Sequence, residues 1–291
     1  MAFEPPQRLV RALGERDDWL GQLPKTVQEA ADRWELDVER VSAPGGRSSL
    51  VLLVRRPDGT AAALKVAPPT ASPALEQAAL EQWDGWGAVR LLAAADGALL
   101  LERLHPEMSL RSLPEAKALL EAAGTVRRLW VEPPADHAFE TVVERTARQA
   151  EVMRAVCDPA SAALVSAALD ARDELTALPP ELLLLHGNFR QGKVLAGDRT
   201  PWLVVGPEPV VGERAYDLAR LARDRVEDLI ASSAGASAAR RRVTRLADSL
   251  EVDGDRLRSW TLFRAVESGT RAVAGGRRQE GELALEFAGW L

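Results

Sequence analysis

The residues with the clearest chemical potential lie in the segment LLHGNFRQGKVL, residues 184–195. This segment places a histidine, an amide and an ammonium group close together, at His186, Asn188 and Lys193. A lysine can neutralise part of the charge of a phosphate. An asparagine side chain can accept a hydrogen bond from a hydroxyl group but cannot take its proton. The segment therefore contains groups that can bind and orient a ligand, while the amide at residue 188 cannot act as a base.

A second set of polar residues lies nearer the amino terminus. Gly45-Gly46-Arg47-Ser48 follows a β-like run. Glycines in such a turn let backbone N–H groups approach a phosphate, although a plain turn explains two glycines equally well. Lys65 lies in the apolar run Ala63-Leu64-Lys65-Val66, where an isolated lysine is usually only an edge charge. Each signal is weak alone, so the surrounding elements must decide how the residues are used.

The first hundred residues predict a helical lead-in followed by a sheet. Residues 4–36 have helical spacing, which predicts two helices with a break at Pro24. Short apolar runs separated by turn residues, such as Asp58-Gly59, predict strands and a hairpin. The expected order is strands at 36–41, 49–55 and 60–66, a helix at 73–83, and strands at 89–92 and 98–104.

The rest of the chain has mostly helical spacing. Ser112 and Glu115 have the spacing of a capping box, which would begin a helix running to Trp130. A non-helical insert at 182–206 interrupts the helical pattern, which resumes at Ala215. The insert contains the segment with the chemically active residues.

These elements divide the chain into two expected lobes, and the fold class is α+β. The amino-terminal lobe, residues 1–104, would contain the helical lead-in, a five-stranded sheet and one helix. The larger carboxy-terminal lobe, residues 105–291, would be helical and carry the insert. A chain of 291 residues with 46% hydrophobic content can bury two moderate cores.

Composition excludes several classes of function. A net charge of −6 and a pI near 5.4 argue against a surface for nucleic acid or anionic membrane. The single cysteine excludes an internal disulfide and, with three histidines, offers no metal framework, which indicates a cytoplasmic protein. No run of 18 apolar residues predicts a membrane span. The expected partners are small molecules or proteins.

Several motifs occur in one order along the chain. They are Ala63–Val66, Trp83–Leu92, Leu99–Leu104, the loop at 184–195, Pro201–Pro209 and Val211–Ala219. Together they resemble the aminoglycoside/hydroxyurea antibiotic phosphotransferases, in particular the streptomycin 6-phosphotransferase-like branch. The resemblance implies a two-lobed protein-kinase-like fold with a small antiparallel β-rich N-lobe and a larger helical C-lobe. It also implies antibiotic-resistance chemistry, the ATP-dependent transfer of a phosphoryl group to an alcohol.

The same resemblance implies roles for individual residues. Lys65 would contact the nucleotide phosphates, and Glu76 on the following helix would be its ion-pair partner. Glu102 and Leu104 would belong to the hinge beside the adenine. Other implied positions are Gly45, Gly46 and Ser48 in the nucleotide-covering turn, and His186 and Asp217 in the scaffold of the catalytic loop.

Three positions depart from the family pattern. Asn188 stands where the family has its aspartate base. Lys193 and Gly206 stand where the family has the asparagine and the aspartate that hold the metal. Glycine has no side chain to bind a metal and an ammonium group repels a dication, so Mg²⁺ binding is disfavoured and no metal site is expected. ATP is the nucleotide that the resemblance implies.

Two further hypotheses concern the missing metal. Lys193 could occupy the vacated position and supply a positive charge to the phosphates, or it could simply point to solvent. Glu208, held between Pro207 and Pro209, is the nearby carboxylate that could recover a metal contact.

The replaced residues favour a pseudokinase that binds a nucleotide or another small ligand in the inter-lobe cleft. The alternative is an active ATP-dependent phosphotransferase of the antibiotic type that works on an alcohol group without metal, using Lys65 and Lys193 as a phosphate clamp. A second alternative is a protein-interaction module with an empty cleft.

Overall fold

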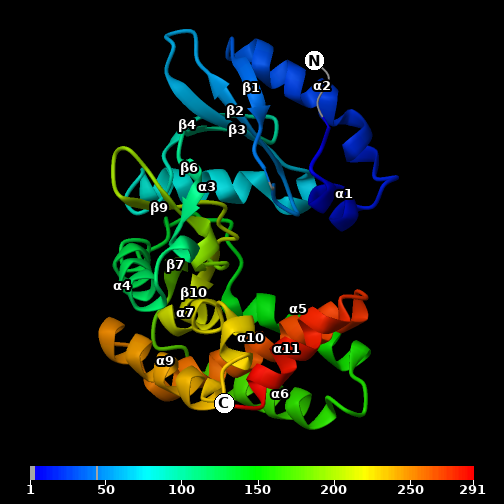
Figure 1. Ribbon diagram of the computed structural model, residues 1–291, viewed down its shortest axis with the longest axis vertical. Helices are drawn as coiled ribbons and strands as arrows, with labels where there is room; N and C mark the ends of the chain where they lie inside the picture. Colours follow the sequence, from blue (N-terminus) through cyan, green and yellow to red (C-terminus); the bar gives the residue numbers. More distant parts are fainter. Residues whose placement is uncertain (1–3, 44) are drawn as a thin grey trace. The chain divides into compact units, whose positions relative to one another are not determined.

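The computed structural model describes residues 4–43 and 45–291, and it contains two compact units (Figure 1). The first comprises the chain up to Pro114 together with Gly192–Gly206. The second comprises Glu115–Gln191 and Pro207–Leu291. The loop segment at 184–195 thus contributes residues to both units.

The first unit contains the expected five-stranded antiparallel sheet, in the order β1-β2-β3-β5-β4. The Asp58-Gly59 turn closes the hairpin between the second and third strands, with the Arg56 N–H donating to the carbonyl of Thr60 at 2.9 Å. The strands are β1 (Asp37–Val41), β2 (Leu50–Arg55), β3 (Ala61–Val66), β4 (Leu91–Ala95) and β5 (Ala98–Glu102).

One strand begins later than the sequence predicted. Residues 89–92 were the expected range, whereas β4 covers Leu91–Ala95. Val89 instead donates its N–H to the carbonyl of Val204, at 2.9 Å, and so pairs with the hairpin at 194–204. The N–H group of Val89 is therefore bonded to a segment more than 100 residues away in the chain. Such a partner cannot be recognised from the sequence around Val89.

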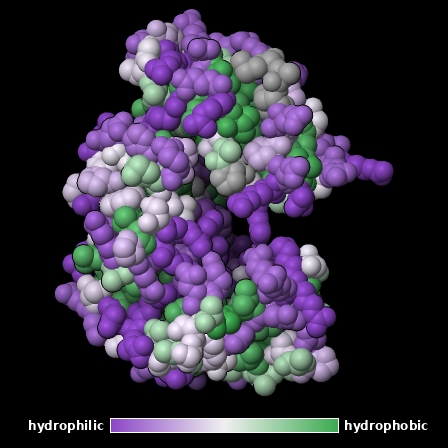
Figure 2. Space-filling model, in the orientation of Figure 1, coloured by the Kyte–Doolittle hydropathy of each residue, from purple (hydrophilic) through white to green (hydrophobic). Residues whose placement is uncertain are grey.

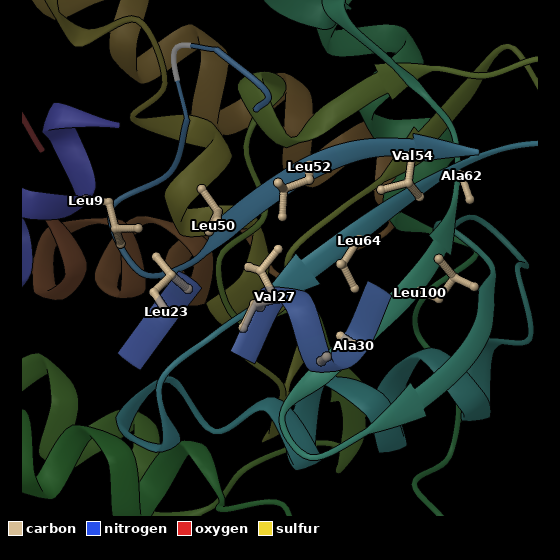
Figure 3. Close-up of a cluster of buried hydrophobic side chains, with 12 residues drawn as sticks. Leu9, Leu23, Val27, Ala30, Leu50, Leu52, Val54, Ala62, Leu64 and Leu100 are labelled. Carbon is tan, nitrogen blue, oxygen red and sulfur yellow. The ribbon is translucent and has the colours of Figure 1, made fainter. Parts of the chain in front are cut away.

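Two helices, α1 (Gln7–Leu13) and α2 (Asp18–Arg33), precede the sheet. Leu23 and Val27 of α2 are buried against alternate residues of β2 and β3, among them Leu52 and Leu64 (Figure 3). Alternation along a strand places these residues on one face of the sheet and their neighbours on the other. Lys65 therefore lies on the face opposite to this core.

The expected break at Pro24 is wrong, because Pro24 lies inside α2. The break between the two helices comes earlier, where the Asp17 carboxylate accepts hydrogen bonds from the N–H groups of Trp19 and Leu20 at 3.0 and 3.3 Å. An internal proline costs a helix about 3 kcal/mol. We attribute its tolerance to the apolar face that α2 buries on the sheet, including Leu23 directly before the proline.

The first unit is completed by the helix α3 (Pro73–Trp83) and a second, three-stranded sheet. That sheet has the order β6-β8-β9, with β6 (His105–Ser109), β8 (Val194–Ala196) and β9 (Trp202–Val204). Pairing with β6 is what joins the hairpin of residues 194–204 to the first unit. Short 3-10 turns cover Pro69–Ala71, Leu110–Ser112 and Gln191–Lys193.

The second unit is largely helical, as expected. Its long helix α10 (Gly254–Ala274) packs against α5, α6, α7, α9 and α11, and Trp260 and Phe263 of α10 are buried with Tyr216. The other elements are α4 (Glu115–Val126), α5 (Val142–Val156), α6 (Ala162–Ala177), β7 (Leu183–Leu185), β10 (Val210–Gly212), α7 (Arg214–Ala222), α8 (Val226–Ile230), α9 (Gly235–Leu250) and α11 (Arg278–Ala288).

The capping box predicted at Ser112 does not form. The Ser112 hydroxyl donates to the carbonyl of Ser109 at 2.8 Å, within a 3-10 turn, and α4 begins at Glu115 itself. The structure has a capping box at another helix, where Thr141 and Glu144 bond reciprocally at the start of α5. Spacing alone does not distinguish the two places, since both offer a hydroxyl three residues before a glutamate.

Hydrophilic side chains cover most of the face shown in Figure 2, and apolar side chains form only small patches on it. The larger apolar residues are used in the interior of the two units. Within the described residues, no helix combines the length and the apolar character that crossing a bilayer would require.

Candidate active site

Lys65 and Glu76 form an ion pair inside the first unit. Lys65 leaves β3 on the face opposite Leu64, and its ammonium group binds the carboxylate of Glu76 from α3. Both side chains are largely buried, with 12% and 5% exposed. The second carboxylate oxygen of Glu76, Oε1, is buried and has no hydrogen-bond partner within the described residues. A phosphate contact for Lys65 remains a prediction, and the ion pair fixes where its ammonium group lies.

The turn at Gly45 has a structural explanation of its own. Gly45 has φ +75°, and a β-carbon there would lie 2.5 Å from Cγ of Pro6. Gly46 and Ser48 are exposed. The close approach of Pro6 accounts for Gly45 without a ligand, while contact between this turn and a nucleotide remains a prediction.

Glu102 at the end of β5 is held by two partners. Its Oε1 atom accepts hydrogen bonds from the backbone N–H of Arg90 and from Nη2 of Arg199, both at 2.7 Å. The N–H of Glu102 donates to the carbonyl of Arg90 at 3.0 Å. Leu104 is buried, and its side chain lies close to Gly197 in the β8–β9 turn. These contacts attach the predicted hinge residues to the neighbouring hairpin.

The catalytic-loop segment is positioned by two short strands of the second unit. Strand β7 leads into the loop and pairs antiparallel with β10, with Leu185 opposite Val210. Continuing this register beyond Leu185 brings Gly187 against Glu208. Gly187 has φ +72°, and a β-carbon there would lie 1.9 Å from the carbonyl oxygen of Glu208. Only glycine fits this contact, so the backbone itself fixes the distance between the two segments.

His186 and Asp217 make hydrogen bonds within this loop. The Asp217 carboxylate accepts hydrogen bonds from the N–H groups of His186 and Gly187, at 3.0 and 2.9 Å. Nδ1 of His186 accepts the N–H of Asn188 at 3.2 Å. Burial raises the pKa of Asp217 from 3.8 to about 6, against the opposing effects of Arg264 and of the two N–H donors. Every one of these groups is committed to the loop conformation.

Asn188 lies directly beside a carboxylate. Its side-chain amide nitrogen donates to Oε1 of Glu208. The segment bearing Glu208 is fixed by Arg145, whose guanidinium donates to the carbonyls of Glu208 and Pro209 at 2.9 Å each. The carboxylate missing from residue 188 is therefore present next to it, on a different segment. From sequence, Glu208 was considered only as a metal ligand, and the two prolines around it were the signal that its position is fixed.

Lys193 and Gly206 are also in contact, within the first unit. The ammonium group of Lys193 donates to the carbonyl of Gly206. Gly206 has φ +63°, and a β-carbon there would lie 3.2 Å from Nζ of Lys193. The lysine side chain is thus directed at residue 206, and the alternative in which it simply points to solvent is not what the structure contains.

The residues present do not suit a magnesium ion. Mg²⁺ prefers an octahedral set of oxygen ligands, commonly one or two carboxylates with phosphates and waters. At the two positions implied to bind metal, the chain has an ammonium group and a glycine, Lys193 and Gly206.

Comparisons with known proteins identify the family and agree with this fold. The model of a family described as aminoglycoside/hydroxyurea antibiotic resistance kinase matches residues 33–276. A streptomycin 6-kinase of Streptomyces glaucescens is 35% identical over 274 residues, which is 91% of this chain and 88% of that protein. A hydroxyurea phosphotransferase of Kitasatospora aureofaciens is 35% identical over 273 residues, 90% of this chain and 75% of that protein.

Two solved structures share the fold at low sequence identity. The aminoglycoside phosphotransferase APH(4)-Ia superposes with a TM-score of 0.64 at 16% identity, covering 91% of this chain and 97% of that chain. The choline kinase LicA from Streptococcus pneumoniae superposes with a TM-score of 0.62 at 12% identity, covering 92% and 97%. The kinase-like fold is therefore shown by structure as well as by sequence. The chain belongs to the aminoglycoside/hydroxyurea antibiotic resistance kinase family.

Proposed function

We propose that this protein is an ATP-dependent phosphotransferase that phosphorylates a hydroxyl group of a small molecule, with lysine side chains doing the work usually given to a metal ion. Its relatives of 35% identity, matched over nine-tenths of the chain, are named as kinases and phosphotransferases. The observation that carries the metal-sparing part is the contact of Lys193 with Gly206, which puts a fixed positive charge at a position that the family pattern gives to metal binding.

Two ammonium groups would neutralise the nucleotide phosphates. Catalysis of phosphoryl transfer consists largely of positioning and of stabilising charge on the phosphate oxygens. Lys65 is held in place by Glu76, and Lys193 by the carbonyl of Gly206. Fixed cations of this kind need no reorganisation when charge moves from the transferred group to the leaving group. The family pattern already includes the lysine at residue 65, so only the single charge of Lys193 stands in for a dication, and a slow enzyme is expected.

Glu208 is the proposed proton acceptor. In the transfer, the acceptor oxygen forms a bond to the γ-phosphorus, and the bond from that phosphorus to the bridging oxygen breaks, leaving its electron pair on ADP. The hydroxyl proton passes to the carboxylate of Glu208, which later releases it to water. The amide of Asn188, bonded to Glu208, would orient the carboxylate. A positioned base of this kind contributes about 10²- to 10⁴-fold in rate.

A coupled assay of ADP release tests the proposal. The purified chain is incubated with ATP and a panel of small alcohols, once with Mg²⁺ and once with a chelator. Acceptor-dependent ADP release that persists in the chelator and disappears in Lys65→Ala supports metal-sparing transfer. Release that requires Mg²⁺ rejects the role of the lysines, and the absence of release with every acceptor rejects the transferase.

A second candidate, a pseudokinase, is favoured by the amide at residue 188. An amide cannot replace a carboxylate base, and the chain lacks both family metal ligands. A ligand that binds only the folded state must raise the melting temperature. Stabilisation by ATP without any ADP release would therefore identify a nucleotide-binding protein that does not transfer phosphate.

A further inference from the structure

Side chains from two helices bind the backbone of Gly187, the residue directly before Asn188. The N–H of Gly187 donates to the carboxylate of Asp217 at 2.9 Å, and its carbonyl accepts a hydrogen bond from Nη2 of Arg264 at 2.8 Å. Nη1 of the same arginine donates to the carbonyl of Tyr216 at 2.9 Å, and its guanidinium carbon lies 4.3 Å from the centre of the Tyr216 ring. Arg264 therefore attaches the peptide between Gly187 and Asn188 to α7 and to its own helix, α10.

Arg145 of α5 holds the facing segment in the same way. Its Nη1 and Nη2 atoms donate to the carbonyls of Glu208 and Pro209, at 2.9 Å each. Its Nε atom donates to the carboxylate of Glu140 at 2.5 Å, and only 16% of the Arg145 side chain is exposed. A β-carbon at Gly187 would lie 2.8 Å from Nη1 of Arg145, so this guanidinium also borders the loop.

The two segments that these arginines hold also meet through their backbones. The N–H of Glu208 donates to the carbonyl of His186 at 2.9 Å. The carbonyl of Glu208 approaches Gly187 so closely that a β-carbon does not fit there. The side chains of Asn188 and Glu208, which extend from these segments, are hydrogen-bonded to each other. The distance between the amide and the carboxylate therefore depends on backbone positions that the two guanidinium groups fix.

Arginine is well suited to this task. Its planar guanidinium carries five donors in a rigid fork and can bond two carbonyls at once, whereas the donors of a lysine all lie on one nitrogen at the end of a flexible chain. Bonds to main-chain carbonyls fix a segment whichever side chain that segment carries. Such bonds can set the position of a catalytic group, and a misplacement of about 1 Å can cost about 10²-fold in rate.

We propose that Arg145 and Arg264 are positioning residues of the phosphoryl transfer, which hold the proposed base Glu208 and its partner Asn188 at a fixed separation through the main chain. This role rests on the proposed function, because it concerns the base that the proposed function assigns. In this role neither arginine touches the nucleotide or the acceptor. Each therefore affects the rate of transfer and not the binding of ATP.

Steady-state ADP release with the most active alcohol of the panel measures this role. Arg145→Met and Arg264→Met should each lower kcat by about 10- to 10²-fold and leave KM for ATP unchanged, because only the position of the base is lost. Arg145→Lys and Arg264→Lys keep the charge and should recover part of the rate. Arg154→Met in α5 and Arg258→Met in α10 alter exposed arginines and should change neither constant. A change in KM for ATP at unchanged kcat would overturn the proposal.

Combination with Glu208→Gln separates positioning from general support of the fold. In the Glu208→Gln background the base is gone, so Arg145→Met and Arg264→Met should lower the remaining rate much less than they do in the natural chain. The Lys variants take their place in this comparison wherever a Met variant does not fold. Equal fold losses in the two backgrounds would assign the arginines to the fold alone and overturn the proposal.

Hydrogen–deuterium exchange of the full chain tests the main-chain contacts without any turnover. Arg264→Met should speed amide exchange in residues 184–191, and Arg145→Met in residues 205–212, by about tenfold, because each segment loses the donor that holds it. Unchanged exchange in both segments overturns the inference, whatever the activity of the chain. Faster exchange in a chain that releases no ADP with any alcohol would instead reject the transferase, and with it the proposed base, while keeping the main-chain contacts.

Discussion

The ammonium group of Lys193 donates a hydrogen bond to the backbone carbonyl of Gly206, and a β-carbon at residue 206 would lie 3.2 Å from the same nitrogen. Two of the three departures from the family pattern, at residues 193 and 206, are therefore in direct contact. The lysine side chain occupies space that an aspartate at residue 206 would need, and its charge lies where a metal ligand is expected. In the proposed metal-sparing site, the lysine at residue 193 and the glycine at residue 206 would therefore act together.

This coupling predicts how ATP binding depends on Mg²⁺. The affinity of the natural chain for ATP should not change when Mg²⁺ is added, because Lys193 repels the ion and Gly206 cannot bind it. The triple variant Asn188→Asp/Lys193→Asn/Gly206→Asp restores the family residues, and Mg²⁺ should strengthen its ATP binding by about tenfold, or about 1.4 kcal/mol. Isothermal titration calorimetry measures both. Asn188→Asp alone is the control and should remain insensitive, while a strong Mg²⁺ effect in the natural chain would refute the coupling.

The Lys65–Glu76 ion pair makes a prediction about stability. Lys65→Ala leaves the buried carboxylate of Glu76 without a partner, which should cost about 3–5 kcal/mol of unfolding free energy. The double variant Lys65→Met/Glu76→Leu should recover most of this loss. Urea unfolding measures the difference, with Lys25→Ala as the control, since the exposed pair of Lys25 and Glu29 contributes only about 0.3–0.5 kcal/mol. Equal effects of Lys65→Ala and Lys25→Ala would mean that burial does not govern this pair.

Asp217 predicts a pH dependence of stability. Its pKa is about 6 in the folded chain and 3.8 ordinarily, so between these values the folded state holds a proton that the unfolded state has released. Its contribution to stability is therefore greatest below pH 3.8 and falls as the pH rises to about 6, by about 3 kcal/mol in total.

Urea unfolding at a series of pH values, compared with Asp217→Asn, isolates this effect. The natural chain should lose stability relative to the variant as the pH rises from about 4 to about 6, because the variant has no carboxyl group to ionise at this position. Parallel curves for the two proteins would show that the hydrogen bonds from His186 and Gly187 offset the cost of burying the charge.

Elements that local interactions determine could be predicted from the sequence, whereas elements that depend on distant partners could not. Strand β3 and the hairpin at Asp58-Gly59 could be predicted, because alternation and turn residues are local signals. Strands β6 and β10 were not predicted, since each is short and exists only through pairing with a distant partner. The helix around Pro24 was misplaced because tertiary burial outweighed a local rule.

The candidate site shows the same division. The loop at 184–195 and its three replaced positions can be recognised from residue types. The direction of the Lys193 side chain cannot, because it depends on the path of the hairpin that carries Gly206. The approach of Glu208 to Asn188 depends on the register of β7 and β10, and the contact of Arg264 with Gly187 depends on how α10 packs against α7.

The contact of Asn188 with Glu208 leads to the most direct test of the chemistry. If Glu208 accepts the proton, Glu208→Gln should lower the rate of acceptor-dependent ADP release by about 10²- to 10⁴-fold. Asn188, which stands at the base position of the family pattern, lies within hydrogen-bonding distance of the Glu208 carboxylate. The double variant Glu208→Gln/Asn188→Asp moves the carboxylate back to that position and should recover much of the rate.

Two controls make this exchange decisive. Glu286→Gln alters an exposed glutamate of α11 and should leave the rate unchanged. Because Glu208 is exposed, Glu208→Gln should hardly alter the melting temperature, so a loss of rate cannot be attributed to unfolding. A Glu208→Gln variant that retains its full rate would exclude this carboxylate as the base. A double variant that is no faster than Glu208→Gln would show that position, and not only charge, determines the transfer of the proton.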